Sequence, residues 1–155
     1  MQNTRNLDGL VSALIDLIGF LSSPQRDDLL LREAGIALDR ALFPLLVRLG
    51  AQGPSSVAAL ADRVGRDHTT VSRQLAKLES LALIERSEDR DDRRRRAARL
   101  TDAGRKTVQA IAAARHRLLS KALAHWSEAD LAALATLNRR FADTLIGLEK
   151  IYQVG

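Results

Sequence analysis

The sequence contains no cysteine, which excludes disulfide bonds, thiolate metal ligands and redox sensing by a thiol. Aromatic residues make up only 3% of the 155 residues, although 46% of the residues are hydrophobic. The core must therefore be built from Leu, Ala, Val and Ile, a composition that favours helices. The length is typical of one domain, so we expect a single globular domain over residues 1–155.

Motifs of enzymes and of membrane segments are also lacking. The sequence has no phosphate-binding glycine loop, no nucleophile elbow and no His-Glu-x-x-His pair, so we expect no enzyme and no cofactor. His116 and His125 lie roughly 13 Å apart on an expected helix, too far to share a metal ion, and no metal site is expected. The apolar stretch from Leu7 to Leu21 is interrupted by two aspartates and a serine, which argues against a signal peptide or a membrane span. We therefore expect a cytoplasmic protein.

Positive charge is concentrated in one segment. The formal net charge is +5 and the pI is near 10.4, values that are compatible with a polyanionic partner but also with many other proteins. Arginine supplies 20 of the 24 basic residues, which suits recognition of phosphate and guanine but also follows from a GC-rich genome. Seven of these arginines lie between Arg86 and Arg99 with four acidic residues. The segment is either a solvated charged run or a surface for nucleic acid.

Hydrophobic spacing predicts four helices, then two strands, then two helices. Leu7 to Leu21 repeats at helical spacing, and a short amphipathic piece at 27–32 leads to Gly35. Pro44 either kinks the second helix or marks its first turn, a turn spans Gly50 to Ser56, and Ser55 or Ser56 caps the third helix. The expected helices are 7–21, 38–51, 57–64, about 68–82, 101–125 and 127 onward; the expected strands are 83–87 and 95–100.

Residues 60–78 fit a helix-turn-helix motif. Ala61 is small where two helices would cross, Gly65 permits the turn between them, and Val71 would anchor the second helix in the core. A second helix held in this way can enter the major groove of DNA. The two strands that follow, joined by the charged residues 88–94, form the hairpin expected of a wing. We therefore predict a mainly α fold with a small β-hairpin wing, a winged helix-turn-helix.

At these residues the chain resembles the MarR family of transcriptional regulators, and the resemblance extends over nearly the whole length. The motifs that match are Thr70-Val71-Ser72-Arg73, Leu78-Glu79, Leu83-Ile84-Glu85-Arg86, Asp92-x-Arg94 and Leu100-Thr101-x-x-Gly104. The resemblance implies a winged helix-turn-helix lobe at about 38–100 and dimerisation helices at about 4–22 and 101–155. The sequence departs from the family at Gln74, where an apolar residue usually packs under the recognition helix.

The family pattern also implies which residues bind DNA. Arg94 would reach the minor groove from the wing tip, and Asp92 would orient it. On the second helix of the motif, Arg73 is the best candidate for a base edge, and hydroxyl groups would contact phosphates. Capping or plain solvation is the alternative role for Thr70 and Ser72. The predicted DNA-binding residues are His68, Thr69, Thr70, Ser72, Arg73, Lys77, Arg93, Arg94 and Arg95.

A homodimer on a palindromic operator follows from the resemblance and from the long apolar stripes at both ends of the chain. The function expected is sequence-specific binding of double-stranded DNA by a repressor that a small anionic aromatic effector releases. The effector pocket is unknown: Phe20, Phe43, Trp126 and Phe141 could line it or could belong to the core or an interface. The alternative function is a non-specific architectural DNA-binding protein without an effector.

Overall fold

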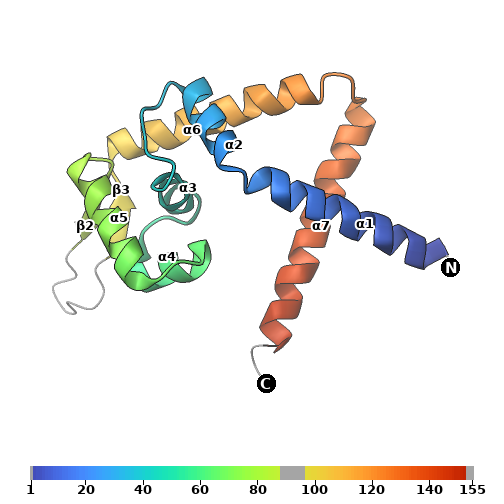
Figure 1. The fold of residues 1–155 in the computed structure, drawn as a ribbon, viewed down its shortest axis with the longest axis horizontal. Helices are drawn as coiled ribbons and strands as arrows, with labels where there is room; N and C mark the ends of the chain where they lie inside the picture. The colour runs from blue at the N-terminus through green and yellow to red at the C-terminus, as the bar shows by residue number, and fades with distance from the viewer. Residues whose placement is uncertain (1, 88–96, 153–155) are drawn as a thin grey trace. The chain divides into compact units, whose positions relative to one another are not determined.

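The computed structural model describes residues 2–87 and 97–152, and the side chains up to residue 148. Two compact units meet along the chain at Arg115 and His116, and α6 runs from the first into the second. The mainly helical fold with a small antiparallel sheet confirms the predicted fold class (Figure 1). The elements are α1 (Gln2–Leu21), α2 (Pro24–Ala34), α3 (Phe43–Gln52), β1 (Ser55–Ser56), α4 (Val57–Val64), α5 (His68–Ser80), β2 (Ile84–Ser87), β3 (Ala97–Leu100), α6 (Asp102–Ala122) and α7 (Glu128–Tyr152).

A hydrophobic core fills the space between α3, α4, α5 and the sheet. Among the described residues no polar or charged side chain is buried. Complete burial of one leucine side chain contributes about 1.5–3 kcal/mol, so this cluster is the main source of stability in the first unit. Its fully buried members, with at most 2% exposure, include Leu45, Leu46, Leu49, Leu60, Val71, Leu75, Leu78 and Ile84.

The helix-turn-helix is formed by α4 and α5, with the bounds that the sequence predicts for α4. The Ser56 hydroxyl accepts a hydrogen bond from the Ala59 N–H at 3.1 Å, so Ser56 and not Ser55 is the N-cap. Gly65 ends α4 in the left-handed conformation, at φ +66°, where a side chain would be strained. Only two residues separate this glycine from α5, so the two helices meet at a tight turn.

The wing strands belong to a three-stranded antiparallel sheet with the order β1, β3, β2. Ile84 pairs with Leu100 and Ser87 with Ala97, which confirms the predicted hairpin pairing. The third strand, β1, was not predicted because it has only two residues, too few for an alternating pattern. The connection at 88–94, and Arg95 and Arg96 of the predicted second strand, lie outside the described residues.

The junction between α5, β2 and α6 explains the motif Leu100-Thr101-x-x-Gly104. Thr101 donates its hydroxyl proton to the Ala82 carbonyl at 2.6 Å and accepts the Gly104 N–H at 3.1 Å, so it both closes the turn and caps α6. A Cβ at Gly104 would overlap the carbonyl oxygen of Leu83. This position therefore needs glycine because a backbone passes directly over it.

The predicted start of the second long helix at Leu38 is wrong. The helix, α3, begins at Phe43, and Pro44 lies in its first turn, where its missing N–H is not needed. Before it, the Asp39 carboxylate accepts the Ala41 N–H at 2.8 Å, and this local hydrogen bond competes with helix formation. The predicted turn at Gly50 is also wrong, because α3 continues to Gln52 and ends at Gly53, where φ is +75°.

Two smaller differences concern helix lengths. The amphipathic piece at 27–32 is part of α2, which has 11 residues and ends at Gly35 as expected. The helix that begins after Thr101 ends at Ala122 rather than at His125, and Ser127 accepts the Asp130 N–H at 3.1 Å to start α7. These differences arise because apolar spacing defines the middle of a helix better than its ends.

The terminal helices expose their apolar side chains. No residue of α1 is buried, and none of the described side chains of α7 is buried. Of the four aromatic residues considered for a pocket, only Phe43 is in the core, whereas Phe20 is 60% and Trp126 48% exposed. Within residues 2–87 and 97–152, no single helix is long and apolar enough to cross a membrane; α1 and α2 pass that test only as a pair, which is bent by 58°.

Candidate nucleic-acid interface

One face of α5 is anchored in the core and the other is open. Val71, Leu75 and Leu78 are 0% exposed, so the helix cannot rotate about its axis without uncovering them. The predicted DNA-binding residues lie on the remaining surface. His68, Thr69, Ser72, Arg73 and Lys77 are exposed, and Thr70 is half-buried. The structure therefore brings all six candidates of the second helix onto the face that a groove of DNA could contact.

Asp67 and Thr70 form the N-cap of α5. The Asp67 carboxylate accepts the Thr70 N–H at 2.8 Å and the Thr70 hydroxyl at 2.6 Å. These hydrogen bonds stabilise the charged form, and with a smaller effect from Arg73 they lower the pKa of Asp67 below its usual 3.8. The Thr70 hydroxyl proton is thus committed to the cap, and this hydroxyl has no proton left to donate to a phosphate.

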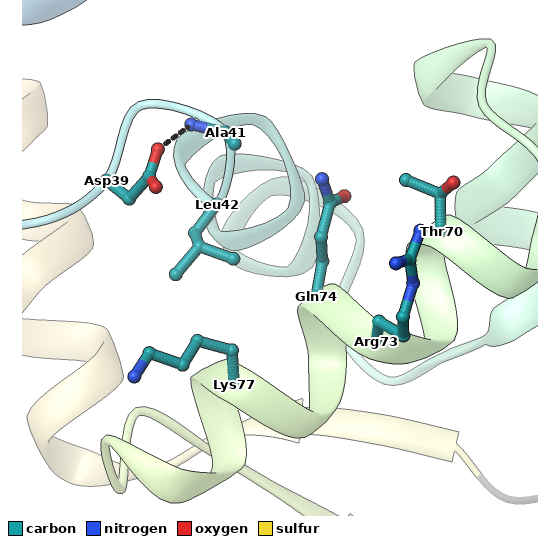
Figure 2. Close-up of a pocket in the computed structure, with 7 residues that line it drawn as sticks. All are labelled: Asp39, Ala41, Leu42, Thr70, Arg73, Gln74 and Lys77. Atoms are coloured by element: carbon teal, nitrogen blue, oxygen red, sulfur yellow. Dashed lines mark hydrogen bonds between the residues drawn. The ribbon is translucent and has the colours of Figure 1, made fainter.

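Arg73 and Lys77 are the cations available on this face. Within the described parts of the chain, neither side chain lies within ion-pair distance of a carboxylate. Figure 2 shows Arg73 on the same face of α5 as Thr70, and Lys77 one turn further along the helix. An exposed guanidinium on a helix surface with its donors unused can form a bidentate contact with a guanine or a phosphate.

A pocket of about 360 Å³ opens between α5 and the segment that precedes α3. Figure 2 shows Asp39, Ala41 and Leu42 on one side and the α5 residues on the other. Three of its lining residues, Thr70, Arg73 and Lys77, are predicted DNA-binding residues. A ligand in this pocket and a DNA duplex on α5 would therefore contact the same side chains.

Arg86 joins the wing to α5, a role that sequence reasoning missed. Its Nη2 donates to the Ser72 carbonyl at 3.3 Å, and its Nε lies 4.0 Å from the Glu79 carboxylate. The side chain is only 19% exposed, so Arg86 lies against α5 and is largely covered rather than presented to solvent. In the sequence Arg86 belongs to the run of basic residues at the wing, and a charge count does not distinguish an arginine packed against a helix from an exposed one.

Gln74, the departure from the family pattern, has a polar partner. Nη1 of Arg66 donates to the Gln74 Oε1 at 2.7 Å and also to the Ala41 carbonyl at 2.7 Å. A hydrogen-bonded amide therefore stands where an apolar side chain is expected. The core below is intact, since Val71 and Leu75 on either side of Gln74 are completely buried.

Comparison with known proteins identifies the fold and the family. A MarR family protein from Bacillus stearothermophilus superposes with a TM-score of 0.79 at 19% identity, over 92% of this chain and 97% of that one. YxaD of Bacillus subtilis, an uncharacterised HTH-type transcriptional regulator, is 31% identical over 109 residues, which cover 70% of this chain and 76% of YxaD. The chain belongs to the HTH-type transcriptional regulators, and its fold is that of MarR family proteins.

Two further matches agree with this assignment. A probable transcriptional regulator from Pseudomonas aeruginosa is 33% identical, covers 83% of this chain and 98% of its own, and superposes with a TM-score of 0.57. The family model described as HVO_A0114 matches residues 38–100, the segment predicted to form the winged helix-turn-helix lobe. The relatives are transcription regulators and not enzymes, as the sequence predicts.

The predicted wing tip lies outside the part of the chain that the structure describes. Asp92, Arg93, Arg94 and Arg95 lie outside the described residues, so their assignment to the minor groove and to the orientation of Arg94 stays a prediction. Arg86, the third residue of β2, donates to the Ser72 carbonyl and so holds the last described part of that strand against α5.

Proposed function

We propose that this protein is a homodimeric repressor of the MarR type, which binds a palindromic operator and is released by a small anionic aromatic effector. The observation that carries the proposal is the open face of α5, where Arg73 and Lys77 are exposed with no acidic partner among the described residues. Arg73 would contact a base edge, Lys77 and the hydroxyls of Thr69 and Ser72 would contact phosphates, and Arg94 would enter the minor groove.

The terminal helices support the homodimer. Of the 18 large hydrophobic side chains that are exposed in the described part of the chain, 14 belong to α1 and α7. Exposed apolar side chains in such number along a helix mark an interaction surface. A two-fold dimer would cover it and place two copies of α5 on half-sites about one turn of DNA apart, which requires a palindromic operator.

The pocket beside α5 supports release by an effector. Its volume of about 360 Å³ suits a small molecule, and Arg73 and Lys77 would attract a carboxylate. Because the same two cations face DNA, an anion held there would lower the affinity for the operator by direct competition. Repression follows if the operator overlaps the promoter, since a bound dimer then blocks the polymerase.

A binding experiment tests this function. Fluorescence anisotropy with the upstream region of the gene and with random DNA should give a preference of about 1,000-fold or more for one palindromic segment. Benzoic and phenolic acids, added as candidate effectors, should then lower the affinity for the operator. Because they would compete directly with DNA, the apparent dissociation constant for the operator should rise linearly with ligand concentration. Equal loss of affinity on both DNAs as salt rises, with no preferred segment, would support the architectural alternative instead.

A further inference from the structure

We propose that Arg66 is a positioning residue for DNA binding: it clamps α5, through Gln74, to the segment that precedes α3. One nitrogen makes both contacts, because Nη1 donates to the Gln74 Oε1 and to the Ala41 carbonyl, each at 2.7 Å. A guanidinium nitrogen of this kind carries two hydrogens, so both are used. The inference rests on the proposed role of α5 in recognising DNA.

At one end of the clamp, neighbouring contacts hold the backbone of Arg66 in place. Arg66 lies directly after Gly65, whose left-handed conformation ends α4, and the Arg66 N–H is bonded to the Ala61 carbonyl at 3.1 Å. Asp67, the next residue, is the N-cap of α5. The backbone of Arg66 is therefore fixed at the turn of the motif, and its side chain reaches two turns along α5 to Gln74. The helix is held at its start and again near its middle.

At the other end of the clamp, the segment around Ala41 is also held by contacts of its own. Ala41 follows Arg40, whose guanidinium lies 3.0 Å from the Asp28 carboxylate of α2. The Ala41 N–H is held by Asp39 at 2.8 Å. The carbonyl that accepts from Arg66 thus belongs to a segment with its own connections to α2, so the hydrogen bond restrains α5 against the rest of the lobe and not against a free loop.

The location of the clamp explains why packing cannot replace it. Val71, Leu75 and Leu78 hold the inner side of α5, and Arg86 holds the side of the wing. On the third side the pocket lies between α5 and the segment at 39–42, so few side chains pack there. Arg66 crosses this side and makes hydrogen bonds from a charged donor, which are stronger than neutral ones.

The position of Gln74 connects the clamp to DNA binding. Since Gln74 is next to Arg73 and one turn before Lys77, a shift of α5 at Gln74 would move both cations relative to a base pair.

Positioning predicts a loss of discrimination rather than a uniform loss of affinity. The measured quantity is the ratio of dissociation constants for random DNA and for the preferred upstream duplex, at equal salt and at a temperature where each variant is folded. Arg66→Ala and Gln74→Ala should each lower this ratio about ten-fold, and the double variant should lose no more than either single one. Arg66→Lys, which keeps donors for both oxygens, should stay within about three-fold of the wild type.

The control is Arg48→Ala, which removes the same charge from an exposed arginine of α3. It should lower affinity for both duplexes alike and leave the ratio unchanged. Hydrogen exchange of the α5 amides in the free protein should accelerate in Arg66→Ala and not in Arg48→Ala.

Each outcome decides between two claims. An unchanged ratio and unchanged exchange in Arg66→Ala and Gln74→Ala, with a discriminating wild type, would overturn the positioning role and leave the proposed function intact. Additive losses in the double variant would also overturn it, because the two residues would then act separately. A wild-type protein that prefers no duplex would reject the proposed function, and the positioning role with it; the exchange experiment would still report whether the contact restrains α5.

Discussion

Leu45, Leu46 and Leu60 of the winged helix-turn-helix lobe are completely buried, whereas Ile18 of α1 is 62% and Leu137 of α7 59% exposed. Both regions are helical and rich in leucine, so composition alone does not separate them. The lobe buries its apolar side chains within one chain, whereas the terminal helices leave most of theirs exposed. Folding stability therefore resides mainly in the lobe, and the proposed dimer would be held together mainly by the terminal helices. The stability of α1 and α7 should therefore depend on protein concentration, and that of the lobe should depend on it much less.

The largest effect should come from adding one methyl group at two glycines, one packed against the lobe at the start of α6 and one in the terminal helix α7. Gly104→Ala would force a Cβ onto the Leu83 carbonyl and should lower the free energy of unfolding by about 3 kcal/mol. Gly147→Ala, in α7, has nothing within 4 Å of the added Cβ and should raise it by up to about 1 kcal/mol through helix propensity. Urea denaturation of both variants measures the difference. A destabilising Gly147→Ala would show that this part of α7 is tightly packed in the assembled protein.

A charge in the exposed apolar surface of α7 tests the assignment of assembly. Leu137→Glu should weaken the dimer on the order of 100-fold, about 2.7 kcal/mol, because the carboxylate would lose its water in the interface. Light scattering over a series of concentrations measures the dissociation constant. Asn138→Glu, an exposed polar position next to it, adds the same charge and should have a much smaller effect. A Leu137→Glu protein as dimeric as the wild type would refute this part of the comparison.

DNA discrimination should depend on the lobe and not on charge in general. Arg73→Ala should cost about 1–3 kcal/mol of preference for the operator over random DNA, with the dimer unchanged. Arg140→Ala removes an exposed arginine from α7 and should leave that preference as it is. Competition binding with both duplexes measures it. An equal loss on both duplexes for Arg73→Ala would make Arg73 a phosphate contact instead of a base contact.

The sequence predicted best those residues whose role depends on local backbone geometry, such as a turn glycine or a helix cap. Gly65 was assigned to the turn and either Ser55 or Ser56 to the cap of α4, and the structure has Gly65 at the turn and Ser56 at the cap. These assignments depend on contacts within a few residues, which the local sequence determines. The winged helix-turn-helix fold followed from the order of such elements and from the family motifs.

Contacts between distant residues were not predictable in the same way. Arg66 meets Ala41 across 25 residues and Arg86 meets Ser72 across 14, and no local pattern marks either arginine. Gln74 was the one indication, since a polar residue in a usually apolar position needs a polar partner. The start of α3 was misplaced for a related reason: Leu38 fits the helical spacing, but the Asp39 side chain bonds to the backbone and favours a turn.

The smallest effect concerns the N-caps of α5 and α7, because one of them ionises and the other does not. Asp67 caps α5, and its hydrogen bonds to Thr70 hold its pKa below 3.8, whereas the uncharged Ser127 caps α7. A carboxylate with a lowered pKa in the folded state stabilises that state above its unfolded pKa, and the stabilisation disappears as pH falls through the folded value. Acid should therefore loosen the first turn of α5 before that of α7.

The variant Asp67→Asn isolates this effect, because asparagine is an equally good N-cap that cannot ionise. The difference in unfolding free energy between wild type and Asp67→Asn should be constant from pH 7 to about 5 and should change in favour of the variant below about pH 4. Denaturation at several pH values, without DNA, measures it, and Ser127→Ala should show no such pH dependence. A difference that stays flat down to pH 2 would mean that Thr70 bonds equally well to the protonated acid, and the two regions would then not differ in this respect.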